Sequence, residues 1–165
     1  MDEQIEARVL GALDALHATY EVIRIDPAHA VTADFCAEYG YSMDASANCI
    51  VVASKTGERR HVACVVQATR RLDVNGVVRR RLGVRKASFA PADETVEVSG
   101  MLPNGVTPFG LPAELPLWVD AGVMAHPRVI VGGGSLSLKL LVDSEVFTRM
   151  PQCEIVEGLA KPREP

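Results

Sequence analysis

The chain has 165 residues, of which 48% are hydrophobic and 23% are charged, and its formal net charge is −4. This length suits one domain with its own core, and this composition is typical of a soluble globular protein. The net negative charge argues against a general polyanion binder, and no apolar run reaches the roughly 18 residues that span a bilayer. We therefore expect one domain over residues 1–165 and no contact with a membrane.

The first residues and the cysteines both favour a cytoplasmic protein. The segment "MDEQIEARVLGALDALHATY" is acidic and amphipathic, unlike a signal or transit peptide. No two cysteines form a C-x-x-C pair, so we interpret them as buried thiols in a reducing cytoplasm. A Cys–His nucleophile pair remains an alternative. The cysteines are Cys36, Cys49, Cys64 and Cys153.

The histidines predict no metal site. They lie far apart, in unlike predicted elements, and neither H-x-E nor H-E-x-x-H occurs. We expect no metal and no other cofactor. The histidines are His17, His29, His61 and His126.

The N-terminal part of the chain predicts two helices around a strand. Residues 2–18 carry apolar residues at helical spacing and predict an amphipathic helix. Residues 20–25 follow as a strand, with Tyr20 and Val22 expected to face the core and Ile23 as a third candidate. Thr32 is the expected N-cap of a second, short helix.

The middle of the chain predicts a β-hairpin and two further helices. Two β-branched runs, 48–54 and 60–68, are separated by the turn sequence "KTGE". Asp73 is the expected N-cap of a helix over 73–83. A short strand over 86–90 and a helix over 91–100 complete this part.

The C-terminal part predicts mainly strands. Irregular alternation of strands with short helices favours an α+β fold with a mixed or antiparallel sheet. We expect the tail after residue 158 to be frayed. The expected strands are 115–120, 128–134, 136–142 and 153–158, and a capped short helix is expected over 143–150.

The loop "NGVTPFGLP", residues 104–112, is unusual because it is both rigid and apolar. Surface loops are usually polar and loosely specified. Its prolines restrict the backbone and its glycines permit unusual dihedral angles. We expect Val106, Phe109 and Leu111 to anchor the loop to the core.

The segment 70–86, "RRLDVNGVVRRRLGVRK", holds seven of the seventeen Lys and Arg residues against one acid, Asp73. Such a patch on an acidic protein predicts either a footprint for phosphate or nucleic acid, or a solvated helix face. Its candidate RNA-binding residues are Arg79, Arg80, Arg81, Arg85 and Lys86.

Several ordered segments together resemble the YbaK/ProX family of free-standing aminoacyl-tRNA deacylases, which is related to the editing domain of bacterial prolyl-tRNA synthetase. The segment "LDVNGVVRRRLGVRKASFAPADETVEVSGMLPNGVTPFGLP" is similar to the family's Asp-containing helix, short strand, small helix and G-x-x-x-P loop. "LPLWVD" is similar to its strand ending in Asp, and "VGGGSLSLKLLV" to its Gly-rich turn and returning strand. The resemblance covers roughly residues 30–157.

The resemblance implies a fold and a chemistry. The fold is α+β, with a mixed, strongly curved, barrel-like sheet and helices around it. The chemistry is hydrolysis of the ester that joins a wrong amino acid to the 3′ end of a tRNA. In this family a water attacks the ester, polarised largely by backbone groups of the loop. The residues thereby implied as catalytic are Asn104, Gly105, Val106, Thr107 and Pro108.

Two residues depart from the family pattern. Asn48 stands where the family has a Lys that helps to hold the tRNA end, and Asn104 stands where the first Gly of the loop should be. Asn tolerates positive φ better than most non-Gly residues, so the loop shape can persist. An alternative to the enzyme is a weak or inactive module that binds an amino acid, an acylated RNA or a synthetase.

Some candidate residues have two interpretations. Thr107 is a substrate- or water-binding hydroxyl, or a turn threonine that bonds its own backbone. Asp120 binds the substrate's ammonium group or caps the following turn. The "GGGS" turn binds phosphate or ribose, or only connects two strands. The substrate-binding candidates are Asn48, Asp120, Gly133, Gly134 and Ser135. The expected partner is the acceptor end of an aminoacyl-tRNA. An aminoacyl-tRNA synthetase is a second candidate partner.

Overall fold

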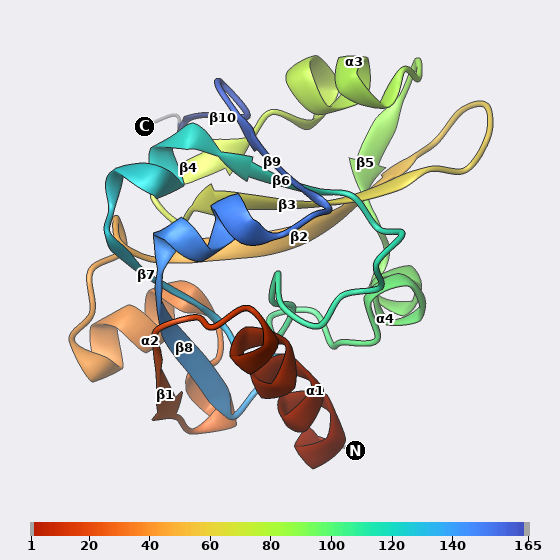
Figure 1. Ribbon diagram of the computed structural model, residues 1–165. Coiled ribbons are helices and arrows are strands. Elements are labelled where there is room, and N and C mark those ends of the chain that lie inside the picture. The colour runs from red at the N-terminus through yellow and green to blue at the C-terminus, as the bar shows by residue number, and fades with distance from the viewer. Residues whose placement is uncertain (1, 164–165) are drawn as a thin grey trace.

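The computed structural model describes residues 2–163. Figure 1 shows strands in the centre of the molecule and helices around them. The helices are α1 (Asp2–Ala15), α2 (Thr32–Tyr39), α3 (Arg79–Leu82) and α4 (Ala92–Ser99), with short helical turns at η1 (Pro27–His29), η2 (Val74–Val78), η3 (Ala121–Ala125) and η4 (Ser144–Arg149). The strands are β1 (Tyr20–Arg24), β2 (Ala47–Ser54), β3 (His61–Gln67), β4 (Arg70–Leu72), β5 (Ala87–Phe89), β6 (Leu117–Asp120), β7 (Arg128–Gly132), β8 (Leu138–Asp143), β9 (Cys153–Val156) and β10 (Ala160–Pro162).

The strands form three hydrogen-bonded sheets. The largest is mixed, in the order β5-β2-β3-β6-β9, with antiparallel pairs around β2 and parallel pairs on both sides of β6. The second is the antiparallel sheet β1-β8-β7, and the third is the pair β10-β4. An isolated parallel bridge between Ser46 and Ile130 links the first two sheets. The mixed α+β prediction is confirmed, but over residues 2–163 no closed or strongly curved barrel is found.

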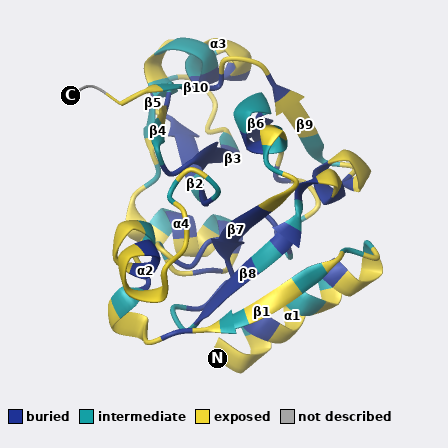
Figure 2. Cartoon of the chain, turned by 90° about the vertical axis from the view of Figure 1, so that its left-hand side faces the viewer, coloured by how far each residue is buried: buried dark blue, intermediate teal, exposed yellow. Residues whose placement is uncertain are grey.

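The main core lies between the large sheet, the β1-β8-β7 sheet and α1. Val9 and Leu13, from the apolar stripe of α1, are fully buried in this cluster together with Leu140 of β8. Figure 2 shows β3 and β7 as mostly buried and the outer side of α1 as exposed. The helical spacing in the sequence therefore predicted the face of α1 correctly. None of the helices within residues 2–163 has both the length and the hydrophobicity needed to cross a bilayer.

Three predictions from local sequence are wrong, and each concerns a segment whose structure depends on contacts with distant residues. Val22 of β1 is 42% exposed, whereas Ile23 packs against a buried cluster around Phe35, so Val22 faces solvent. Thr32 is the first residue of α2 and not its N-cap, which is Val31. The tail is not frayed over its described part, because Ala160–Pro162 pairs with β4.

Two predicted helices exist in a modified form. The Asp73 side chain accepts hydrogen bonds from Gly76 N and Val77 N, which confirms its capping role. The chain that follows, however, is π-helical over Val74–Val78 before it becomes α3. Likewise Ser144–Arg149 is a 3₁₀-helix, and Asp143 before it forms no side-chain cap.

Candidate active site

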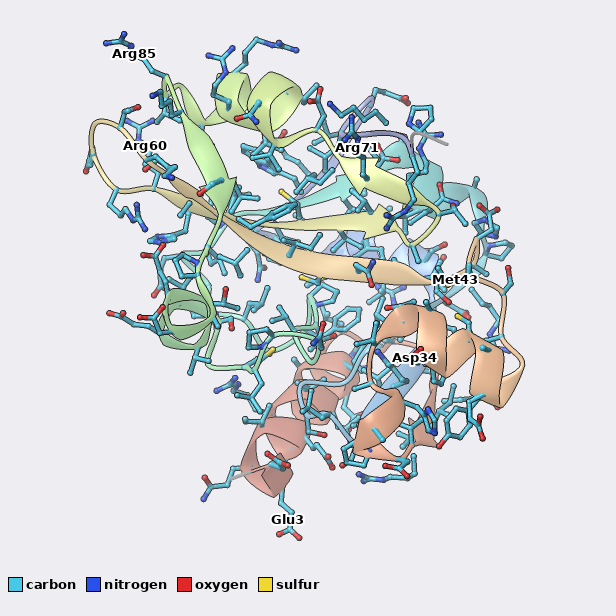
Figure 3. The ribbon with its side chains drawn as sticks, turned by 180° about the vertical axis from the view of Figure 1, so that it is seen from behind. Glu3, Asp34, Met43, Arg60, Arg71 and Arg85 are labelled. Atoms are coloured by element: carbon cyan, nitrogen blue, oxygen red, sulfur yellow. The ribbon has the colours of Figure 1, made fainter. Side chains whose placement is uncertain are left out.

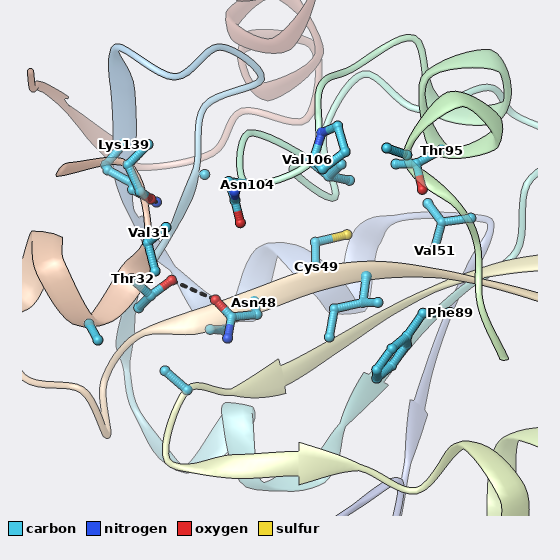
Figure 4. Close-up of a pocket in the computed structure, with 18 of the residues that line it drawn as sticks. Val31, Thr32, Asn48, Cys49, Val51, Phe89, Thr95, Asn104, Val106 and Lys139 are labelled. Carbon is cyan, nitrogen blue, oxygen red and sulfur yellow. Dashed lines mark hydrogen bonds between the residues drawn. The ribbon is translucent and has the colours of Figure 1, made fainter. Parts of the chain in front are cut away.

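A cavity of about 490 Å³ opens between β2, the start of α2, α4 and the loop that contains Asn104. Figure 4 draws 18 of the residues that line it. The lining residues are Ala30, Val31, Thr32, Ala33, Met43, Ala47, Asn48, Cys49, Ile50, Val51, Ala68, Phe89, Ala90, Ala92, Thr95, Pro103, Asn104, Val106, Gly132, Lys139 and Arg163.

The cavity has a polar end and a more apolar end. Figure 4 places Thr32, Asn48, Asn104 and Lys139 at one end and Val51, Thr95 and Phe89 at the other. No Asp, Glu or His is among the described residues that line it. The polar side chains that line the cavity are therefore neutral hydrogen-bonding side chains and the cations Lys139 and Arg163.

Backbone contacts fix the loop that forms one wall. Asn104 has a φ of 69°, so it takes the left-handed conformation expected from its place in the motif. Gly105 N–H donates to Leu102 O at 2.9 Å, and Gly134 N–H donates to Gly105 O at 2.8 Å. A Cβ on Gly105 would lie only 3.0 Å from Gly134 O, which leaves no room for a larger side chain. The loop backbone is thus seated on the Gly-rich turn.

The apolar side chains of the loop anchor it as expected. Val106, Phe109 and Leu111 are all buried in the main core cluster. The Phe109 ring stacks on Phe147 of η4, with 5.7 Å between the ring centroids. Gly110 has a φ of 80° and packs against the backbone of α1. These contacts make the wall rigid.

The structure brings only part of the implied catalytic segment to the cavity surface. Asn104 and Val106 line it, whereas Gly105, Thr107 and Pro108 are buried behind them. Thr107 is fully buried, and its hydroxyl has no hydrogen-bond partner among residues 2–163. Its N–H donates to the sulfur of Met101 at 3.5 Å. The backbone bond considered for its hydroxyl is not formed, and Thr107 is not among the described residues that line the cavity.

Asn48 lies at the start of β2 and faces the cavity. Its Oδ1 accepts a hydrogen bond of 2.6 Å from the Thr32 hydroxyl, drawn as a dashed line in Figure 4. This bond leaves the amide nitrogen as a donor without a hydrogen-bonded partner among residues 2–163. Thr32, expected to cap a helix, instead holds the side chain of Asn48 in place.

Lys139 is a cavity residue that the sequence reasoning missed. It comes from β8 and is only 5% exposed, and its ammonium donates to Ala30 O at 2.7 Å. Burial lowers its pKa below the ordinary value. The available signal was a single Lys within the apolar run "LSLKLLV", which is unusual in a buried strand.

Cys49 also lines the cavity, but as a neutral thiol. Burial raises the pKa of its thiol to about 12, so the nucleophilic thiolate is scarce at neutral pH. No histidine accompanies it among the described lining residues. All four cysteines are free. The geometry gives the Cys–His alternative no support.

Four of the substrate-binding candidates lie outside the cavity lining. Asp120 is buried, and its carboxylate accepts from Gly122 N and from Ala160 N, both at 3.0 Å. Ser135 donates to Glu6 Oε2 of α1 at 2.6 Å. A Cβ on Gly133 would lie 2.5 Å from Leu138 Cγ, and one on Gly134 would lie 2.7 Å from Ile5 Cγ2. The structure thus gives each of these residues a packing or hydrogen-bonding role.

The candidate RNA-binding side chains divide into engaged and exposed ones, and none of them lines the cavity. Arg79 donates to the carbonyls of Asn75 and Val84. Arg81 lies over the Trp118 ring at 4.8 Å and pairs with Glu154 at 2.5 Å.

Arg80, Arg85 and Lys86 are exposed, and their side chains have no partner among residues 2–163. In Figure 3, Arg60, Arg71 and Arg85 lie on one side of β2, and Glu3 and Asp34 lie on the other. Arg85 thus lies on the same side of β2 as Arg60 and Arg71 in Figure 3.

Several solved structures are similar to this chain in fold. The hypothetical protein APE2540 is 23% identical with a TM-score of 0.81, and the match covers 93% of this chain and 99% of that one. A candidate trans-editing enzyme for prolyl-tRNA synthetase is 20% identical with a TM-score of 0.78, covering 96% and 98%. A scaffold protein for presenting linear epitopes is 18% identical with a TM-score of 0.77, covering 96% and 98%.

At these identities the structural matches establish the fold alone. No curated protein sequence matches the chain. The family model of the aminoacyl-tRNA editing domain, however, matches residues 26–150, which is most of the sequence. The chain therefore belongs to the aminoacyl-tRNA editing domain family.

Proposed function

We propose that this protein hydrolyses the ester between a wrongly attached amino acid and the 3′ end of a tRNA. Membership of the editing-domain family supports this role. The similarity in fold to a candidate trans-editing enzyme supports action in trans, on aminoacyl-tRNA that a synthetase has released. Prolyl-tRNA synthetase is the synthetase partner that this similarity suggests.

The cavity suits such a substrate in size and character. A volume of about 490 Å³ falls within the range of small-molecule sites and accommodates an amino acid with part of the terminal ribose. Its apolar end can hold hydrocarbon, and its polar end can hold hydrogen-bonding groups. Phe89 is 57% exposed at the cavity and offers a flat ring to a nucleobase of the acceptor end.

The observation that carries the proposal is the fixed backbone of the loop wall. Ester hydrolysis needs a positioned water and donors that stabilise the developing oxyanion. No Asp, Glu or His among the described lining residues offers a general base, and the Cys49 thiol is largely protonated. We infer that backbone groups around Asn104 and Val106 position the attacking water. A wall pinned to the Gly-rich turn has the rigidity that this mechanism requires.

The proposal is tested with a panel of tRNAs, each charged with a wrong amino acid. We expect the protein to release at least one amino acid faster than spontaneous hydrolysis does. Binding to each charged tRNA is measured alongside. Binding without any accelerated release would refute the hydrolase and leave the alternative, a module that binds acylated RNA.

A further inference from the structure

Lys139 is a buried cation whose charge the protein itself does not neutralise. It is 5% exposed, and its ammonium donates a hydrogen bond to the Ala30 carbonyl at 2.7 Å. The Phe35 ring lies 5.6 Å from the Nζ atom. Among residues 2–163 no carboxylate forms an ion pair with it or contributes to its pKa.

Such a residue is costly for folding. An ammonium group has three N–H donors, and a buried charge is normally paired with a counter-ion. The neighbours of Lys139 on β8 are Leu138 and Leu140, so an apolar side chain would continue the strand without this cost. Among residues 2–163 the structure gives this cation the bond to Ala30 O and the contact with the Phe35 ring, but no carboxylate partner.

The neighbours of Lys139 place it on the side of the β7-β8 pair that faces the cavity. On β7 it is paired with Gly132, whose missing Cβ would lie 2.9 Å from Val106 O. Cross-strand partners face the same side of a sheet. The loop wall therefore lies on the same side as Lys139, and Figure 4 shows Asn48 and Asn104 at this end of the cavity. Here a cation and an amide donor face a space that no carboxylate lines among the described residues.

We propose that Lys139 binds an anionic oxygen group of the substrate, with the Asn48 amide as a second donor. Two parts of an acylated RNA carry such a group. One is a phosphodiester near the 3′ end, and the other is the side-chain carboxylate of an acidic amino acid. This proposal rests on the proposed hydrolase function, because that function makes acylated RNA the ligand. It adds which group of the RNA or its amino acid Lys139 binds. The binding itself does not require hydrolysis.

The test compares Lys139→Met with the wild type and with Lys55→Met, which removes an exposed lysine outside the cavity lining. Affinity is measured for an uncharged CCA-ending minihelix and for amide-linked, non-hydrolysable aspartyl and asparaginyl minihelices. Removing a charge-assisted hydrogen bond should weaken binding about tenfold or more in Lys139→Met. Lys55→Met should leave the affinity unchanged. Thermal stability of Lys139→Met should equal or exceed that of the wild type, because an unpaired buried charge is gone.

The three ligands separate the two sources of the anion. Weaker binding of all three ligands identifies a phosphodiester, and weaker binding of the aspartyl minihelix alone identifies the carboxylate. Lys139→Gln, which keeps a donor but not the charge, should behave like Lys139→Met and replaces it if that variant does not fold.

Unchanged affinity for all three ligands in a folded variant would overturn the proposal. Because the ligands cannot be hydrolysed, a failure of the hydrolase assay and a failure of the anion site are distinguishable.

Discussion

At the scale of single residues, the environment of each side chain decides what it can do. Cys49 is in the cavity, but burial keeps it a thiol. Thr107 belongs to the loop motif, but its hydroxyl is enclosed in the core. Asn48 has no charge, but Thr32 holds it in a defined orientation. The chemistry expected from a residue type thus holds only where its surroundings permit it.

The Cys49 thiol should be dispensable for catalysis. A thiol with a pKa of about 12 supplies almost no nucleophile at pH 7, so Cys49→Ala should retain kcat/KM within about threefold. Two measurements check the prediction. The first is the deacylation rate of Cys49→Ala, and the second is the rate at which the wild-type thiol is alkylated. A drop of a hundredfold or more in a folded Cys49→Ala variant would mean that the sulfur takes part in the reaction.

Phe89 should contribute to binding of the acceptor end. A stacked base is worth about 1–3 kcal/mol, so Phe89→Ala should weaken minihelix binding by roughly 5- to 150-fold. The variant should unfold nearly as the wild type does, because the side chain is 57% exposed. Ile155→Ala is the matched control, since Ile155 is 40% exposed and outside the cavity lining. Equal affinities of both variants and the wild type would exclude stacking on Phe89.

At the scale of elements, α1 supports the wall of the site from behind. Gly134 packs against Ile5 and Val9 of α1, and Ser135 donates to Glu6. Glu6 also pairs with Arg24 of β1 at 2.6 Å. The helix therefore holds the Gly-rich turn, and the turn holds the backbone of the loop.

Glu6→Gln should weaken this support in a pH-dependent way. Burial raises the pKa of Glu6, but hydrogen bonds from Ser135 and Arg24 and the Arg24 charge outweigh it and hold the pKa below 4.5. A carboxylate whose pKa is lower in the folded than in the unfolded state contributes stability at any pH above its unfolded-state pKa. This contribution is lost as the pH falls through the folded-state pKa.

The free energy of unfolding of Glu6→Gln should be lower than that of the wild type by about 1 kcal/mol at pH 7. The difference should shrink below pH 4.5. Urea unfolding at several pH values measures it, with Glu3→Gln as an exposed control on the same helix. A deficit that stays constant down to strongly acidic pH would show that charge is not its cause.

The sequence predicted elements where a local signal exists and missed contacts that depend on distant segments. Apolar spacing identified α1, and the capping signal at Asp73 is confirmed by its hydrogen bonds. The Gly-rich turn predicted that β8 returns beside β7, but no local pattern shows that Lys139 of β8 lines the same cavity as Asn48. The tail is a second example of distant contacts. Ala160–Pro162 pairs with β4, and Ala160 N donates a hydrogen bond to the Asp120 carboxylate. The resemblance to a family identified the loop, but only packing shows which of its residues reach the cavity.

At the scale of the whole molecule, an acidic protein carries exposed cations in its basic segment, residues 70–86. The net charge is −4, yet Arg60, Arg71 and Arg85 lie on one side of β2 in Figure 3. Arg81 is already paired with Glu154, whereas Arg80 and Arg85 are exposed. We expect the proposed tRNA substrate to contact these exposed arginines while its 3′ end enters the cavity.

Reversing Arg80 and Arg85 to Glu should weaken tRNA binding and reduce its dependence on salt. For each phosphate that the variant no longer neutralises, the slope of log K against log salt should become shallower by about 0.7–0.9. Arg149→Glu, on η4 and outside the basic segment, is the control. Affinity is measured at several salt concentrations. An unchanged slope in the double variant would leave these arginines as a solvated face.

The most direct test of the account concerns Gly105, because the central claim is that a fixed loop backbone performs the chemistry. Gly105→Val would place atoms against Gly134 O and Ser135 O, which lie 3.0 and 3.1 Å from the position of a Cβ. Gly11→Val, on the exposed side of α1 with nothing within 4 Å, is the matched control. The measurement is the single-turnover rate of deacylation of the best tRNA substrate. We predict a drop of at least a hundredfold for folded Gly105→Val and less than a twofold change for Gly11→Val, whereas a fully active Gly105→Val would contradict catalysis by the loop backbone.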